Sequence, residues 1–182
     1  MTKRRIAEAA LVLLEENATP TTKEISERAK VSHRLLFHHY KDFDALLAAV
    51  AEIQIERYRR DVAAVPPHLA LRERVTRTVR HRASLYESMG HLGSNVSALS
   101  SRVRAVAEGA AHCHDILASR LEHTFREEVD AAGRRGREVL GAIDAAVSWH
   151  LWDYLRRVSR LSPAATRRVM VKLLEAAVAD LD

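Results

Sequence analysis

The 182-residue sequence has very little cysteine and no long apolar run. Cys113 is the one cysteine, so no disulfide can form within the chain, which is typical of a protein from a reducing compartment. No segment approaches the roughly 18 uncharged apolar residues that a membrane span needs. Residues 1–5 are basic and residue 8 is acidic, so the start of the chain lacks the apolar core of a secretory signal. We therefore expect a cytoplasmic protein with no membrane partner.

Glycine, proline and aromatic residues are also scarce. The chain has 6 Gly and 4 Pro, and aromatic residues make up 5% of it, so signals for strands and tight turns are few. Alanine, leucine, arginine and glutamate dominate instead, and these residues favour helices. The composition predicts an all-α fold.

Familiar catalytic motifs are missing as well. The sequence contains no HExxH, GxSxG, GxGxxG or Walker lysine motif, so we expect neither an enzyme nor a cofactor. The segment His112-Cys113-His114-Asp115 is the one cluster with metal-ligand chemistry. On a helix, however, His112 and His114 point about 200° apart. We expect no metal site, and a helical metalloenzyme built on His112, Asp115 and His123 remains the enzyme-class alternative.

The charge of the chain favours a polyanionic partner without identifying one. The formal net charge is +5 and the pI is about 9.7. Residues 1–50 carry eight Lys or Arg against seven Asp or Glu, yet residues 29–41 contain no acid at all. This run can face phosphate without repulsion. A solvated charged helix is the alternative reading of the same pattern.

Residues 6–40 predict three successive helices. Apolar residues at helical spacing give a first helix that ends near Asn17, a plausible left-handed cap. Thr21 and Glu24 form a capping-box pattern that begins a short second helix. Ser32 is a good N-cap for a third helix, which runs to about residue 39 or 40. Two short helices joined by a three-residue turn and packed on a longer one make a helix-turn-helix unit.

The rest of the chain predicts further helices. Asp42 can cap a fourth helix, and Pro66-Pro67 stops it. We place a domain boundary inside this helix, near residue 48, so the domains are residues 1–48 and 49–182. Beyond the prolines we expect helices at about 69–88, 95–106, 110–132 and 138–158. Ser162-Pro163 begins the last helix.

Residues 4–50 resemble the DNA-binding domain of TetR/AcrR-family regulators. The segments that carry the resemblance are 6–11, 23–29, 31–32, 36–40 and 45–47. The resemblance implies an N-terminal three-helix helix-turn-helix domain, joined by a continuous helix to a helical ligand-binding and dimerisation domain. It further implies a repressor that a small, largely apolar effector releases from a palindromic operator of double-stranded DNA. An effector-independent DNA-binding or architectural protein of the same fold is the alternative.

The resemblance and the capping pattern together select residues for DNA contact. A third helix capped at Ser32 enters the major groove N-terminus first, so His33 and Arg34 are best placed to meet base edges. Lys23 and Thr22 start the second helix, where the family contacts phosphate, whereas Leu36 belongs to the core. The full predicted set is Lys23, Thr22, Ser32, His33, Arg34, His38, Tyr40 and Lys41.

Several positions depart from the family pattern, and Arg34 and Leu35 stand where Gly and Thr are common. Lys30 stands where the turn usually has Gly, so a non-Gly residue must fit that turn, with a positive φ as one solution. Phe37 and Phe43 replace a Tyr and a Lys that usually reach phosphate.

Two further sets of residues concern the effector and the subunit interface. A group of large side chains either lines an effector cavity or fills the core: Tyr86, Met89, Phe125, Trp149 and Trp152. In the last two helices, apolar side chains exceed what one internal face buries, which predicts a homodimer with a four-helix interface. The predicted interface residues are Leu151, Leu155, Val158, Met170, Leu173, Leu174 and Ala177.

Overall fold

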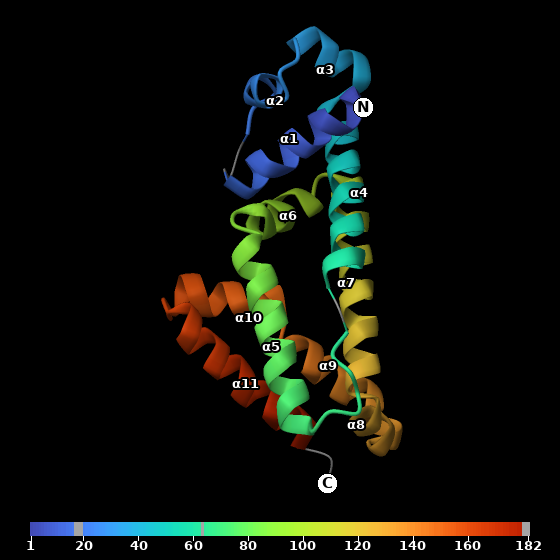
Figure 1. Ribbon diagram of the computed structural model, residues 1–182, viewed down its shortest axis with the longest axis vertical. Helices are drawn as coiled ribbons and strands as arrows, with labels where there is room; N and C mark the ends of the chain where they lie inside the picture. Colours follow the sequence, from blue (N-terminus) through green and yellow to red (C-terminus); the bar gives the residue numbers. More distant parts are fainter. Residues whose placement is uncertain (17–19, 63, 180–182) are drawn as a thin grey trace. The chain divides into compact units, whose positions relative to one another are not determined.

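The all-α prediction is confirmed. A computed structural model of the chain describes residues 1–16, 20–62 and 64–179, and every regular element in those ranges is a helix (Figure 1). Within the same ranges no helix is long and apolar enough to cross a membrane. The predicted cap at Asn17 lies outside the described residues.

The helices form two compact units that each combine separate stretches of the chain. Unit 1 contains residues 1–61 and 89–116, and unit 2 contains the described residues from 62–88 and from 117 onward. The predicted boundary near residue 48 falls inside α4 (Phe43–Asp61), which is continuous there. The division of the chain into a DNA-binding domain at 1–48 and a second domain at 49–182 therefore remains a prediction.

Unit 1 holds the N-terminal helices. It comprises α1 (Thr2–Glu16), α2 (Thr22–Arg28), α3 (His33–His39), α4, α6 (Leu92–Ser100) and the first part of α7 (Arg104–Thr124). In Figure 1, α1 lies beside α2 and α3, and it packs on α4 as well. The side chains that fill this core are Ile6, Leu11, Ile25, Leu36 and Leu46.

Gly90 allows the chain to pass close to the end of α1. Its φ is +52°, and a Cβ at this position would collide with the Glu15 carbonyl. The neighbouring His91 N–H donates to that same carbonyl at 2.9 Å. This contact joins α6 to α1 within unit 1.

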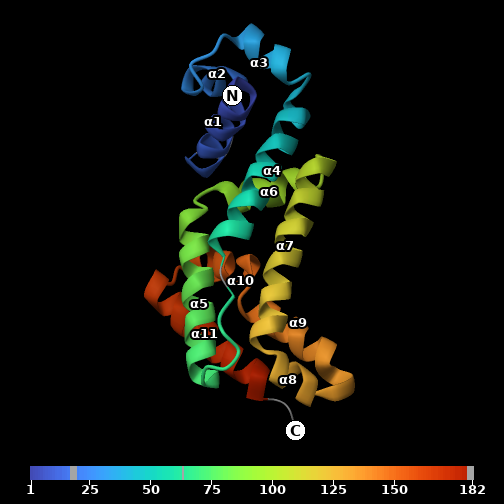
Figure 2. The same ribbon diagram turned by 45° about the vertical axis from the view of Figure 1, so that its right-hand side comes forward.

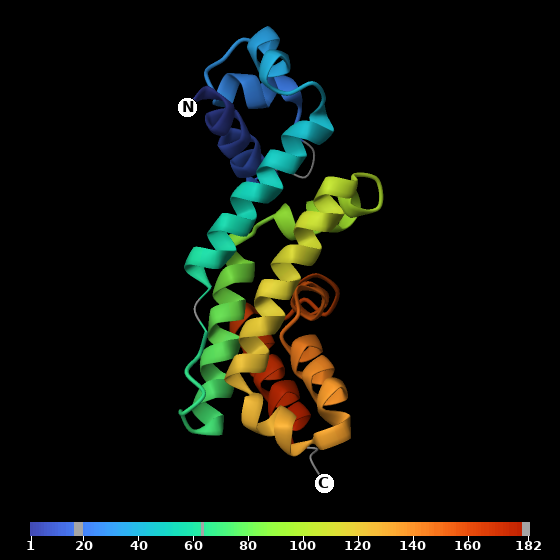
Figure 3. The same ribbon diagram turned by 90° about the vertical axis from the view of Figure 1, so that its right-hand side faces the viewer.

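Unit 2 holds the remaining helices. It comprises α5 (Leu71–Ser88), the end of α7, α8 (Arg126–Ala131), a 3₁₀ turn (Gly133–Arg135), α9 (Gly136–Ala146), α10 (Trp149–Asp153), a π-helical turn (Tyr154–Val158) and α11 (Pro163–Ala179). Figures 2 and 3 show α11 beside α5 and α9, and it packs on both. Its core side chains include Phe125, Ile143, Met170, Leu174, Val75 and Val79.

Two predicted helices around α7 have wrong bounds. The helix expected at 95–106 is α6, which ends at Ser100, and α7 begins at Arg104 instead of residue 110. The expected continuation to residue 132 breaks between Thr124 and Arg126, because the Thr124 carbonyl accepts a hydrogen bond from Arg74 at 2.9 Å. The Thr124 hydroxyl also donates to the Val65 carbonyl at 3.0 Å. Tertiary contacts therefore end α7 at Thr124, although the helical spacing of the sequence continues beyond this residue.

The prediction of a single helix at 138–158 is also wrong, because the structure has three separate helical elements in this segment. The chain leaves α9 after Ala146, and Ser148 starts α10 by accepting a hydrogen bond from the Leu151 N–H at 3.1 Å. By contrast, the start of the last helix is confirmed: Ser162 caps α11 at the Ala165 N–H, 3.2 Å away. The helix expected at 69–88 is α5.

Candidate nucleic-acid interface

The second helix of unit 1 begins with the predicted capping box. The Thr21 hydroxyl accepts the Glu24 N–H at 3.2 Å, and the Thr21 N–H donates to the Glu24 carboxylate at 2.6 Å. This bond lowers the pKa of Glu24 below its ordinary value. The carboxylate is thereby committed to the start of α2.

The turn between α2 and α3 uses a residue in the left-handed region. Lys30 has φ of +51°, so the positive φ considered for this non-Gly residue is confirmed. The Val31 N–H closes the turn on the Ser26 carbonyl at 3.0 Å. Ser32 then caps α3 by accepting the Leu35 N–H at 3.1 Å, as predicted.

Two contacts hold α3 in unit 1. Leu36 is 1% exposed and lies in the core, as predicted. Tyr40, directly after α3, is 3% exposed, and its hydroxyl donates to the Lys3 carbonyl at 2.8 Å. The buried side of α3 is thus fixed at Leu36, and the chain after α3 is fixed at Tyr40.

The opposite side of α3 faces solvent with two cations nearby. Arg34 and Lys23 are exposed, and neither makes a hydrogen bond or ion pair with any residue the structure describes. A guanidinium in this state can donate two hydrogen bonds to a guanine, whereas a lysine ammonium acts as a point charge toward phosphate. The geometry therefore offers one base-reading group and one phosphate-binding group.

His33 and Thr22 contact each other instead of standing apart. The Thr22 hydroxyl and His33 Nε2 are 3.0 Å apart, which links the start of α2 to the start of α3. The His33 ring also meets the Phe37 ring edge-on at 4.8 Å. Phe37 is 40% exposed, so this pair adds an apolar surface to the exposed side of α3.

The remaining members of the predicted DNA-binding set differ in exposure. Ser32, His38 and Lys41 are exposed, and Lys41 lies 3.6 Å from the Asp42 carboxylate. Tyr40 is buried, and its hydroxyl already donates to Lys3. A buried, bonded hydroxyl has no donor left for phosphate, so we remove Tyr40 from the set proposed below.

One basic residue at this surface was missed. The Lys3 ammonium lies 5.4 Å from the centre of the Tyr40 ring, so α1 brings a further cation to the chain that follows α3. In the sequence, the basic run of residues 3–5 was the feature that could have indicated a further phosphate-binding residue. Sequence spacing gave no reason to place it near residue 40.

The predicted effector residues do not form one group. Tyr86 meets Trp149 edge-on at 5.6 Å and lies 6.1 Å from Trp152 in unit 2, but Phe125 is fully buried against Arg74. Met89 belongs to unit 1, where its sulfur accepts the Tyr58 hydroxyl at 3.4 Å. The structure thus brings together three aromatic residues of the five.

The segment around Cys113 assembles no metal cluster. In the ranges that the structure describes, no three His, Cys, Asp or Glu side chains gather closely enough to share a metal ion. His112 instead lies 2.8 Å from the Arg59 guanidinium. Burial raises the pKa of Cys113 to about 11, which keeps the group in its thiol form.

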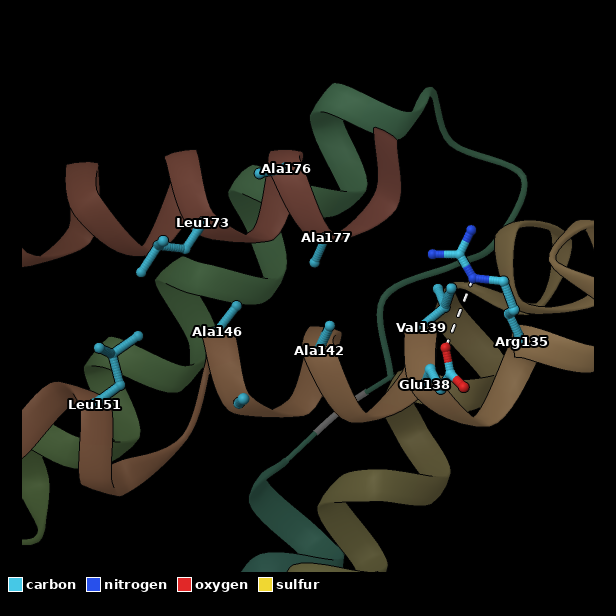
Figure 4. A pocket seen from close by; sticks show the side chains of 10 residues that line it. Arg135, Glu138, Val139, Ala142, Ala146, Leu151, Leu173, Ala176 and Ala177 are labelled. Carbon is cyan, nitrogen blue, oxygen red and sulfur yellow. Dashed lines mark ion pairs between the residues drawn. The ribbon is translucent and has the colours of Figure 1, made fainter. Parts of the chain in front are cut away.

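A groove in unit 2 contains part of the predicted dimer interface. It has a volume of about 590 Å³ and lies between α9 and α11, with Leu151 and Leu173 at one end and the Arg135–Glu138 pair at the other (Figure 4). Half of the residues that line it are alanines: Ala142, Ala145, Ala146, Ala176 and Ala177.

The predicted interface residues divide by exposure. Leu173 is 43% exposed and Val158 65%, and Leu151 and Ala177 are partly exposed. Leu155, Met170 and Leu174 are buried in the single chain. A side chain enclosed by its own chain has no surface left for a partner, so the proposed interface is restricted to the first four.

Comparison with known proteins supports the assignment of this surface. Residues 6–50 match the family model described as bacterial regulatory proteins, tetR family. The match covers α1, α2, α3 and the start of α4. No curated protein matches the chain.

Proposed function

We propose that this chain, a DNA-binding transcriptional regulator of the TetR family through residues 6–50, is a repressor that a small, largely apolar effector releases from a palindromic operator. The observation that carries the proposal is the exposed side of α3, where Arg34 has no partner among the described residues. We place this function in the cytoplasm.

In the proposed complex, α3 enters the major groove with its N-terminus first. Arg34 donates to a guanine base, and His33 lies beside it at the groove floor. Lys23, Thr22, Ser32, His38 and Lys41 bind the phosphates on either side, and Lys3 joins them. These contacts position the protein, whereas Arg34 supplies the sequence preference.

A palindromic operator requires two copies of α3, and the groove of unit 2 supports a homodimer. Leu151, Leu173 and Ala177 line this groove and are at least partly exposed, and Val158 is a further exposed apolar residue of unit 2. A second copy related by a two-fold axis covers the same residues with its own, because such an interface is self-complementary. The effector then acts by changing the separation of the two recognition helices.

The test is selection of bound DNA from a random pool by the full-length chain. The proposal expects enrichment of a palindrome whose half-sites are about one helical turn, or roughly 10 base pairs, apart. Enrichment of a single half-site would contradict the dimer, and no enrichment would contradict sequence-specific binding. An operator complex that no compound weakens would support the effector-independent alternative.

A further inference from the structure

Helix α3 exposes a phenylalanine close to its exposed arginine. Phe37 is 40% exposed and follows Arg34 by three residues. Because each residue of an α-helix turns by about 100°, these two side chains lie only about 60° apart around the helix. Leu36, which fixes the buried side of α3, lies about 160° from Arg34. Phe37 therefore belongs to the side of α3 that faces DNA in the proposed complex.

A neighbouring side chain holds the Phe37 ring. His33 meets this ring edge-on, with 4.8 Å between the ring centres, and His33 Nε2 lies 3.0 Å from the Thr22 hydroxyl. A series of contacts thus runs from the start of α2 through His33 to Phe37. A side chain that its neighbours already hold loses little conformational freedom when a ligand covers it. The Phe37 ring is therefore suited to be a contact surface.

The chemistry of a phenyl ring limits what Phe37 can contact on DNA. The ring has no charge and no hydrogen-bonding group, so it can neither bind phosphate nor read the polar edge of a base. The major groove contains one apolar group, which is the methyl group at C5 of thymine. Contact of phenylalanine with this methyl group is a known way to distinguish thymine from the other bases.

The charges along this segment favour DNA as the partner of the ring. Single exposed apolar residues are common on protein surfaces and do not by themselves indicate a binding site. Phe37, however, belongs to the run of residues 29–41, which contains no acidic residue. Arg34 and Lys41, on either side of it in the sequence, are exposed cations. A polyanion can therefore approach the ring without repulsion from this run.

We propose that Phe37 contacts the C5 methyl group of a thymine in each half-site of the operator. The inference rests on the proposed function, because it concerns the base sequence that α3 reads. It differs from the role that the family resemblance implies, in which a tyrosine at this position reaches phosphate. Residues three apart in an α-helix are separated by a rise of about 4.5 Å, close to the spacing of about 3.4 Å between base pairs. The thymine therefore lies within about two base pairs of the guanine that Arg34 contacts.

Removal of the methyl group from the DNA measures this contact directly. Deoxyuridine has the same hydrogen-bonding groups as thymidine, but it lacks the C5 methyl group. Burial of one methyl group contributes about fourfold to affinity, so its loss from both half-sites should weaken binding about fifteenfold. A thymine that Phe37 does not contact should tolerate the same replacement.

The experiment uses the full-length chain and a duplex that this chain enriches from a random pool. Each thymine on either strand of the half-site is replaced in turn by deoxyuridine, at the symmetric positions of both half-sites, and the dissociation constant is measured by fluorescence anisotropy. We expect a replacement within about two base pairs of the guanine contacted by Arg34 to weaken binding about fifteenfold. The absence of an effect at every position, or a half-site without thymine, would overturn the inference.

Variants test whether Phe37 makes the contact. In Phe37→Ala the same replacement should weaken binding less than about twofold, because no ring covers the methyl group. Phe37→Tyr retains the ring and should retain the discrimination between thymine and uracil. Leu35→Ala is the matched control, because Leu35 is 37% exposed on the same helix but lies about 160° from Phe37. Discrimination that persists in Phe37→Ala, or that is lost in Leu35→Ala, would overturn the inference.

The outcome is separable from that of the proposed function. A variant that folds poorly would lose affinity for the thymine duplex and the uracil duplex equally, so the ratio of the two affinities reports the contact alone. Enrichment of a palindrome whose binding is insensitive to uracil contradicts only this inference. Failure to enrich any sequence contradicts the proposed function and this inference together.

Discussion

Arg34 and Lys23 carry the same charge on neighbouring helices but have different roles in the proposed complex. Arg34→Ala should relax the base preference at one symmetric position in each half-site and cost about 1–3 kcal/mol per lost bidentate pair. Lys23→Ala should weaken binding to all sequences and reduce the salt dependence. Selection from a random pool and salt titrations measure both effects. Identical operators with equal stringency for wild type and Arg34→Ala would refute base reading by this residue.

The backbone conformation of Lys30, with φ of +51°, leads to a prediction about stability. A left-handed conformation costs a non-Gly residue about 1–2 kcal/mol, and glycine avoids most of this cost. Lys30→Gly should therefore raise the free energy of unfolding by up to about 1 kcal/mol. Urea denaturation measures the change. Lys172→Gly, in the exposed part of α11, is the control and should lower stability by about 1 kcal/mol, so a loss at both positions would contradict the argument.

At the scale of the elements, the Arg74–Glu128 pair joins α5 to α8 and decides where α7 ends. Arg74 also holds the Thr124 carbonyl, the last residue of α7. Removing one member of a buried pair leaves an uncompensated charge. Glu128→Gln should therefore lower the free energy of unfolding by about 3–5 kcal/mol.

Glu127→Gln is the matched control for this prediction. Glu127 is adjacent in sequence and lies 4.0 Å from the same guanidinium, but its side chain is 78% exposed. Its loss should change stability by less than about 1 kcal/mol, because exposed ion pairs contribute little. Thermal and urea denaturation of both variants test the difference. Equal effects would show that burial does not set the strength of this pair.

At the scale of the whole molecule, Leu173 and Leu174 separate dimerisation from folding. Leu173 is 43% exposed at the groove, whereas Leu174 is 0% exposed in the core of the chain. Leu173→Glu should give a folded monomer that binds the operator poorly, because the charge would be buried in a dimer interface. Leu174→Glu should unfold the chain at a cost of several kcal/mol.

Sedimentation and circular dichroism of the two variants measure these outcomes. A folded dimer of Leu173→Glu would place the interface on another surface. A wild-type chain that sediments as a monomer at micromolar concentration would contradict the homodimer altogether.

The sequence by itself determined the local features of unit 1. The capping box at Thr21, the caps at Ser32 and Asp42 and the burial of Leu36 all follow from interactions within a few residues, and the structure has each of them. Such interactions depend on spacing along the chain, which is visible in the sequence. For the same reason the all-α fold and the start of the last helix were predictable.

Only the tertiary structure decided features that depend on distant partners. The end of α7 depends on Arg74, which lies 50 residues away in sequence, and the burial of Tyr40 depends on Lys3. The burial of the polar residues Arg74, Thr78, Arg82 and Tyr86 on α5 was also not predictable, because their spacing does not say which of them find a hydrogen-bond partner. Helical periodicity gives the side of a helix on which a residue lies, but not what covers that side. The Thr78 hydroxyl, which is buried without a hydrogen-bond partner, could therefore be recognised only in the folded chain.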